Sequence, residues 1–157
     1  MTDETRALES LWRFNQLHDE MEALYHRMAA RCGLSDSAFI ILYVLCQFET
    51  CRPTDICAHS FLSKQTVSSA LQKLQREGLL ESQAGPGRQL FYRLSEAGKQ
   101  ISRERVLPIM RAEAAAFDRM GDEQEAFLAL YRQYLTLLRE EFAAPAFPLQ
   151  SDPKEQV

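Results

Sequence analysis

Apolar residues recur every three or four positions through the N-terminal part of the chain. They are Leu8, Leu11, Trp12, Leu17, Met21, Leu24, Tyr25 and Met28. This spacing places them on one face of a long helix over about residues 5–31, which Gly33 ends. A second apolar stripe over residues 40–48 predicts a buried helix whose N-terminus is capped by Ser35 or Asp36.

Residues 52–78 carry the signals of two short helices joined by a tight turn. Pro53 suits the first turn of a helix, and the chain turns again near residues 60–62. Ser63 is placed to cap the next helix, which Gly78 ends. The pattern therefore predicts a helix-turn-helix.

A β-hairpin follows this pair of helices. Two strand-like runs occupy residues 79–82 and 89–94, and Gly85-Pro86-Gly87 between them is a strong turn signal. A helix-turn-helix with a hairpin after it describes a winged helix-turn-helix. The predicted fold class is mainly α, with a two-stranded β wing and additional helices at both ends of the chain.

The C-terminal part predicts two more helices. Ser95 caps the first, which we expect to be broken or kinked near Pro108, and Asp122 caps the second. We expect the chain to consist of four segments. They are an N-terminal dimerisation helix (1–34), a DNA-binding unit (35–99), C-terminal dimerisation helices (100–142) and a flexible tail (143–157).

The outer helices carry more apolar surface than the small winged unit can cover. Burial against a second copy of the chain, across a two-fold helical interface, is the economical solution. The alternative is that these helices fold back on their own chain as a monomeric bundle. We expect the dimer.

The helix after Ser63 has two unlike faces. Val67, Ala70, Leu71 and Leu74 follow helical spacing and define its buried side. The remaining positions are polar and uncharged or basic, with no carboxylate before Glu77, which suits a helix lying among phosphates. The residues expected to contact base edges are Gln65, Thr66, Ser68, Ser69 and Gln72. Those expected to contact phosphates are Ser63, Lys64, Lys73, Arg76 and, on the hairpin, Arg88. The alternative is an exposed face that serves only solubility.

The distribution of charge changes what the net charge implies. The whole chain carries −4, which by itself argues against nucleic acid as a partner. Residues 53–99, however, hold 6 basic and 4 acidic residues and so carry +2, between flanks of −3 each. The chain has no uncharged run of the ~18 residues that span a bilayer and begins with a polar segment, so we expect a soluble cytoplasmic protein with no membrane contact.

Catalytic and metal-binding patterns are absent from the sequence. The four cysteines, at 32, 46, 51 and 57, contain no C-x-x-C pair and are expected to be reduced thiols. Cys51, beside Arg52, is the strongest candidate for redox sensing, because a nearby cation lowers a thiol pKa. No nucleophile–base constellation or phosphate-binding loop is present, so we expect neither an enzyme nor a cofactor or metal.

Two stretches resemble one known family. Residues 62–80, Leu-Ser-Lys-Gln-Thr-Val-Ser-Ser-Ala-Leu-Gln-Lys-Leu-Gln-Arg-Glu-Gly-Leu-Leu, resemble the recognition-helix signature of MarR-type transcriptional regulators. Residues 94–99 resemble the exit from the wing in the same proteins. The resemblance implies a homodimer that binds a pseudo-palindromic DNA operator through two winged units about 34 Å apart. It also implies a repressor that a small organic effector relieves.

The chain departs from the family pattern at two places that matter. Arg88 lacks the Asp that commonly precedes it in the wing. Phe61 stands where the family often has Gly, so we expect packing to lock the turn between the two short helices.

An effector cavity is expected where the dimer helices meet the DNA-binding unit. Trp12, His18 and Tyr25 on the first helix and Tyr43 on the second are the candidates to line it. The alternative for each is ordinary core or dimer packing. The sequence thus predicts a homodimeric DNA-binding repressor. The alternative is a helical dimerisation or adaptor protein whose winged unit binds protein.

Overall fold

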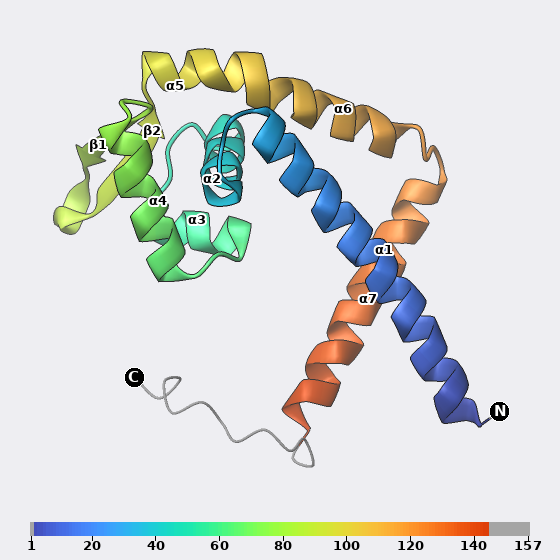
Figure 1. Cartoon of the computed structure of the whole chain (residues 1–157). Helices are drawn as coiled ribbons and strands as arrows, with labels where there is room; N and C mark the ends of the chain where they lie inside the picture. The colour runs from blue at the N-terminus through green and yellow to red at the C-terminus, as the bar shows by residue number, and fades with distance from the viewer. Residues whose placement is uncertain (1, 145–157) are drawn as a thin grey trace. The chain divides into compact units, whose positions relative to one another are not determined.

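The computed structural model describes residues 2–144, apart from the side chain of Arg88. Its helices and strands, in chain order, are α1 (Asp3–Arg31), α2 (Asp36–Gln47), α3 (Pro53–Ser60), α4 (Lys64–Arg76), β1 (Leu80–Ala84), the 3₁₀ turn η1 (Pro86–Arg88), β2 (Leu90–Leu94), α5 (Glu96–Ile101), the π-helical turn η2 (Ser102–Val106), α6 (Leu107–Asp118) and α7 (Glu123–Ala143) (Figure 1). The predicted fold class, mainly helical with a two-stranded wing, is confirmed.

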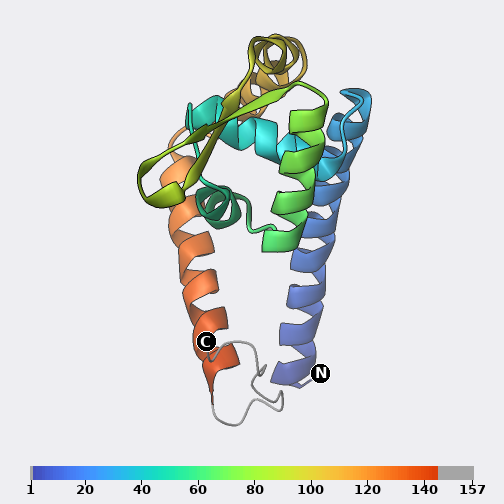
Figure 2. The same cartoon turned by 90° about the vertical axis from the view of Figure 1, so that its left-hand side faces the viewer.

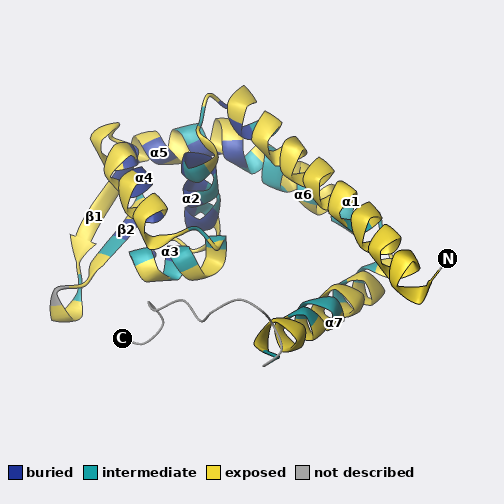
Figure 3. Ribbon diagram, turned by 60° about the horizontal axis from the view of Figure 1, so that its bottom comes forward, coloured by how far each residue is buried: buried dark blue, intermediate teal, exposed yellow. Residues whose placement is uncertain are grey.

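The described chain divides into two compact units within α6, one ending at Ala112 and the other beginning at Glu113. The first unit contains the core, with α2 at its centre in contact with α1, α3, α4, β2 and η2. Ile41 and Leu42 of α2, Ile56 of α3 and Leu74 of α4 are completely buried there. Figure 3 shows buried positions along much of α2. The apolar stripe of each short helix therefore holds the winged unit together.

Serine side chains begin three of the helices, as the sequence predicts. The hydroxyl oxygens of Ser35, Ser63 and Ser95 accept backbone N–H groups three residues later, at 3.3, 3.1 and 3.0 Å. Each bond satisfies a donor that the first helical turn leaves unpaired. The caps explain why these helix starts are visible in the sequence.

The start of α3 is closed differently, by a reciprocal pair. The Asp55 carboxylate accepts from the Arg52 backbone N–H at 3.0 Å and from the Arg52 guanidinium at 2.6 and 2.9 Å. These hydrogen bonds lower the pKa of Asp55 to about 2, and those from the Arg52 side chain contribute more than the one from its backbone. The Arg52 guanidinium is therefore occupied by its ion pair with Asp55.

The break expected near Pro108 is present one turn earlier. The Leu107 N–H donates to the Ser102 carbonyl, a bond one residue wider than that of an α-helix. Pro108 has no N–H and its ring crowds the carbonyl four residues before it, so the preceding turn widens.

Asp122 occupies the N-cap position of α7, where the sequence predicts the helix to begin, but it lacks the expected capping bond. Its backbone is helical and its side chain makes no capping bond. Residues 119–122 instead form turns closed by backbone bonds, in which Gly121 has φ +56°. The expected tail over 143–157 lies, from residue 145 on, outside the described residues.

The wing is an antiparallel hairpin that begins next to the C-terminal end of α4 and extends away from that helix (Figure 2). Leu80 pairs with Leu94 at its base and Ala84 with Leu90 near its tip. Tyr92 also exchanges two backbone hydrogen bonds with Cys51, at 2.8 and 3.0 Å. The loop before α3 therefore joins the sheet, a pairing that local sequence signals do not indicate.

Candidate nucleic-acid interface

The two faces of α4 separate as predicted. Val67, Ala70, Leu71 and Leu74 are buried against the core. The five residues expected to contact bases are all exposed, and they are Gln65, Thr66, Ser68, Ser69 and Gln72. Because α4 contains no Asp or Glu, the exposed surface offers amide, hydroxyl and basic groups only.

Four of those five side chains have no hydrogen-bond partner among the residues that the structure describes. Thr66 differs, because its hydroxyl lies 2.8 Å from that of Ser63, the cap of α4. The free groups are Gln65, Ser68, Ser69 and Gln72, which leaves their donors and acceptors available to an external partner.

The expected phosphate-binding residues also lie on the surface. Ser63, Lys64, Lys73 and Arg76 are exposed. Lys73 is 3.9 Å from the Glu77 carboxylate, a distance at which an exposed pair contributes little. The backbone of Arg88 lies in η1, but its side chain falls outside what the structure describes. Its expected role stays a prediction.

The hairpin is tied to the C-terminal end of α4 through polar contacts that sequence reasoning missed. Gln75 Nε2 donates to Ser82 Oγ of β1 at 2.9 Å. Ser95 Oγ, besides capping α5, donates to the Gly78 carbonyl at 2.6 Å, and its N–H donates to the Leu79 carbonyl at 3.0 Å. The wing and α4 therefore hold fixed positions relative to each other.

The turn between α3 and α4 is not locked by packing, contrary to expectation. Phe61 is 92% exposed and has φ +56°, in the left-handed region. Backbone and hydroxyl bonds hold the turn, because the Phe61 N–H donates to the Cys57 carbonyl and Ser60 Oγ donates to that of Ile56. This conformation costs a residue other than glycine about 1–2 kcal/mol.

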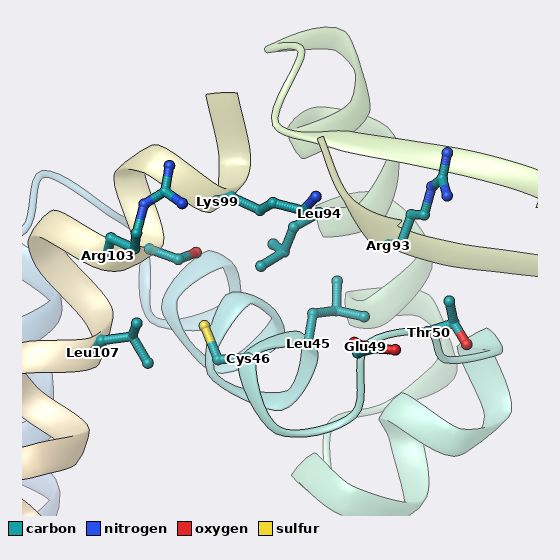
Figure 4. Close-up of a pocket in the computed structure, with 10 residues that line it drawn as sticks. Leu45, Cys46, Glu49, Thr50, Arg93, Leu94, Lys99, Arg103 and Leu107 are labelled. Atoms are coloured by element: carbon teal, nitrogen blue, oxygen red, sulfur yellow. The ribbon is translucent and has the colours of Figure 1, made fainter. Parts of the chain in front are cut away.

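A cavity of about 400 Å³ lies between the end of α2, the base of the wing and the α5–η2 segment (Figure 4). Its lining includes the basic side chains of Arg93, Lys99 and Arg103 and a single carboxylate, that of Glu49. Burial raises the pKa of the Cys46 thiol in its wall, and contact with the Ser102 hydroxyl partly offsets this. Arg93 is already paired with Glu81 at 2.9 Å and Lys99 with Glu96 at 2.7 Å. Arg103 forms no ion pair with the described residues, so its positive charge favours a ligand that carries negative charge.

The residues expected to line an effector cavity are not brought together within one chain. Trp12 and Tyr25 are exposed on α1 and, at 1.5 Å per residue, lie about 20 Å apart along the helix. His18 lies between them, 3.7 Å from Glu22. Tyr43 is half-buried on α2, and none of the four lines the cavity at the base of the wing. An effector site at these residues stays a prediction.

Cys51 is a poor redox centre in this environment. Cys51 is buried, and this burial raises the pKa of its thiol, with a smaller contribution from the charge of Asp55. The sequence predicted the opposite direction, because Arg52 is its neighbour. All four cysteines are free thiols. Across residues 2–144, no group of three His, Cys, Asp or Glu side chains is placed to hold a metal ion, and no single helix is long and apolar enough to cross a membrane.

The chain is similar to known proteins in sequence and in fold. A family model described as "MarR family" matches residues 33–89, the segment that contains α2, α3, α4, β1 and the turn η1 but not β2. No curated protein matches the sequence.

Solved structures share the fold over most of their length. A MarR family regulator from Neisseria meningitidis is 22% identical, with a TM-score of 0.71 over 84% of this chain and 94% of that one. AbfR in a DNA-bound structure is 20% identical, with a TM-score of 0.64 over 88% and 99% of the two chains. NadR in complex with 4-hydroxyphenylacetate is 16% identical, with a TM-score of 0.64 over 78% and 88%.

Proposed function

We propose that the chain is a transcriptional regulator of the MarR family, whose model matches residues 33–89, and that it is a homodimeric repressor of the cytoplasm that binds a pseudo-palindromic DNA operator. In this proposal α4 enters the major groove and the wing approaches the adjacent minor groove. The observation that carries the proposal is the exposed, carboxylate-free face of α4 with its unpartnered polar side chains. The DNA-bound AbfR structure, which shares the fold, supports it.

Exposed apolar side chains on the outer helices support dimerisation. On α1 they are Leu8, Leu11, Trp12, Leu17, Met21, Leu24 and Tyr25, and on α7 they are Phe127, Leu130, Tyr131, Leu137 and Phe142. Large apolar side chains exposed in this number on a helix mark an interaction site, and a second copy of the same chain covers such faces in two-fold dimers. The two copies of α4 in the dimer would then bind in successive major grooves of the DNA.

Selection from random DNA with the purified full-length protein tests the proposal. We expect enrichment of a pseudo-palindrome whose half-sites are centred about 10 base pairs apart, and binding that falls steeply with salt. If no palindrome is enriched at low salt, the regulator proposal fails and the adaptor alternative, in which the winged unit binds protein, replaces it.

Gln72→Ala is expected to relax base preference at one position of each half-site. The Gln72 amide is exposed and free to pair with a base edge, so its removal lowers discrimination there by about 1–3 kcal/mol. The measurement is a competition titration of the variant against operators that carry each base at every position. A uniform loss across all sequences would contradict the assignment of Gln72 to base contacts.

Arg88→Ala provides the contrasting variant for the same titration. A phosphate contact carries no sequence information, so this change should weaken binding to all sequences alike. It should also make the salt dependence shallower by about two units in the slope of log affinity against log salt concentration, about one for each Arg88 of the dimer.

We also propose that the cavity at the base of the wing holds a small organic anion that relieves repression. Its cationic lining carries this proposal, and the NadR complex with 4-hydroxyphenylacetate, a carboxylate, supports the ligand class. With 4-hydroxyphenylacetate as the probe, we expect saturable binding in calorimetry that Arg103→Ala weakens by about tenfold, as for one charge-assisted hydrogen bond. Arg111→Ala, an exposed change on α6 outside the cavity, is the matched control. Equal binding by both variants would place the ligand elsewhere.

A further inference from the structure

Phe61 combines two features that the fold does not require. Among the residues that the structure describes, it is the only residue other than glycine with a positive φ. Its side chain is 92% exposed, the largest exposed fraction of any large apolar side chain in the described chain. Glycine would adopt the same backbone without strain, and the exposed ring gains little from packing.

The position of Phe61 places it beside the proposed DNA-reading surface. It stands two residues before Ser63, the N-cap of α4, so the two Cα atoms are at most about 7.6 Å apart. Residues at the N-terminus of a recognition helix are those that reach base edges. No Asp or Glu occurs between Asp55 and Glu77, so the carboxylate-free surface extends from α4 through this turn.

We propose that Phe61 contacts an apolar part of the operator at the edge of the major groove. DNA offers two such surfaces there, the C5-methyl group of thymine and the carbon atoms of deoxyribose. The inference rests on the proposed function, because it requires that α4 bind DNA. In this proposal the aromatic ring in the turn contributes a part of the DNA affinity, and the polar face of α4 contributes the rest.

Phe61→Gly separates this role from a structural one, because stability and binding should change in opposite directions. Relief of the left-handed strain is expected to raise the Tm by about 2–8 °C. Loss of the ring from both half-sites is expected to weaken operator binding by about tenfold. Phe61→Leu is the matched control, since it keeps an apolar side chain and the strain, and should bind within about threefold of the wild type.

Operators in which deoxyuridine replaces thymine identify the surface that is contacted. Each substitution removes only a methyl group. If the ring touches a thymine methyl, one substitution weakens the wild type but not Phe61→Gly. If no substitution distinguishes the two proteins although Phe61→Gly binds weakly, the ring contacts deoxyribose.

The titration of the wild type distinguishes failure of the Phe61 proposal from failure of the proposed DNA-binding function. If the wild type binds its selected operator and Phe61→Gly binds it equally well with the same salt dependence, the role of Phe61 is overturned and the proposed function stands. If the wild type binds no operator, the proposed function fails and this inference falls with it. A Phe61→Gly protein that loses thermal stability also contradicts the proposal, because the ring would then be structural.

Discussion

A single carboxylate at Ser69 is expected to lower operator affinity by about 100-fold or more. Ser69 lies on the exposed side of α4 and has no partner among the described residues, so Ser69→Asp should leave the fold intact. In the complex the new charge would lie among phosphates, and like-charge juxtaposition at an interface costs several kcal/mol. Each 1.4 kcal/mol is a factor of ten in affinity, and a dimer carries the change twice.

Ser69→Asn is the control for this experiment. Asn has nearly the size of Asp and a similar helix propensity but no charge. We expect it to bind within a few fold of the wild type in fluorescence anisotropy titrations. Raising the salt concentration should narrow the gap between the two variants, because ions screen exposed charges. Similar affinities for both variants at low salt would place this face of α4 away from DNA.

The second large effect is expected at Gly98, in the first turns of α5. A Cβ atom there would lie 2.0 Å from the carbonyl oxygen of Leu79, which accepts the Ser95 N–H. Backbone cannot move aside as a flexible side chain does, so Gly98→Ala should lower the free energy of unfolding by roughly 3 kcal/mol through overpacking. The measurement is urea denaturation of the full-length protein.

Ala97→Gly provides the matched control for Gly98→Ala. Ala97 is exposed on the same turn, so its replacement tests helix propensity alone and should cost about 1 kcal/mol. By propensity alone, Gly98→Ala would stabilise the helix by a similar amount. A Gly98→Ala protein as stable as the wild type would show that α5 and the backbone of Leu79, between α4 and β1, do not pack this closely.

The burial and exposure of residues along α4 are predictable from the sequence because the signals for them are local. The burial of Val67 and Leu74 and the exposure of Gln65 and Ser69 follow from helical spacing alone. The caps at Ser35, Ser63 and Ser95 follow from side chains that bond backbone groups three residues away. Asp122 shows the limit of such signals, because a preceding turn with Gly121 at positive φ replaced its expected cap.

Features that depend on distant segments were not predictable. Arg52 suggested a lowered pKa for Cys51, yet Arg52 is engaged by Asp55 while Cys51 is buried where the loop pairs with Tyr92. The expected packing of Phe61 failed because no neighbouring element covers it. The cavity at the base of the wing is lined by residues of α2 and the loop after it, of β2, and of the segment α5–η2–α6. These parts lie far apart in the sequence, so no local pattern predicts the cavity.

The sequence by itself determined the winged helix-turn-helix and the two faces of α4. These rest on periodicity, capping residues and turn residues, each of which acts within a few positions of the chain. The tertiary structure alone decided that Gly98 must lack a side chain, that Gln75 and Ser95 hold the wing against α4, and that the ring of Phe61 is exposed. Such features depend on which backbone and side-chain atoms meet after folding, and short-range patterns do not contain that information.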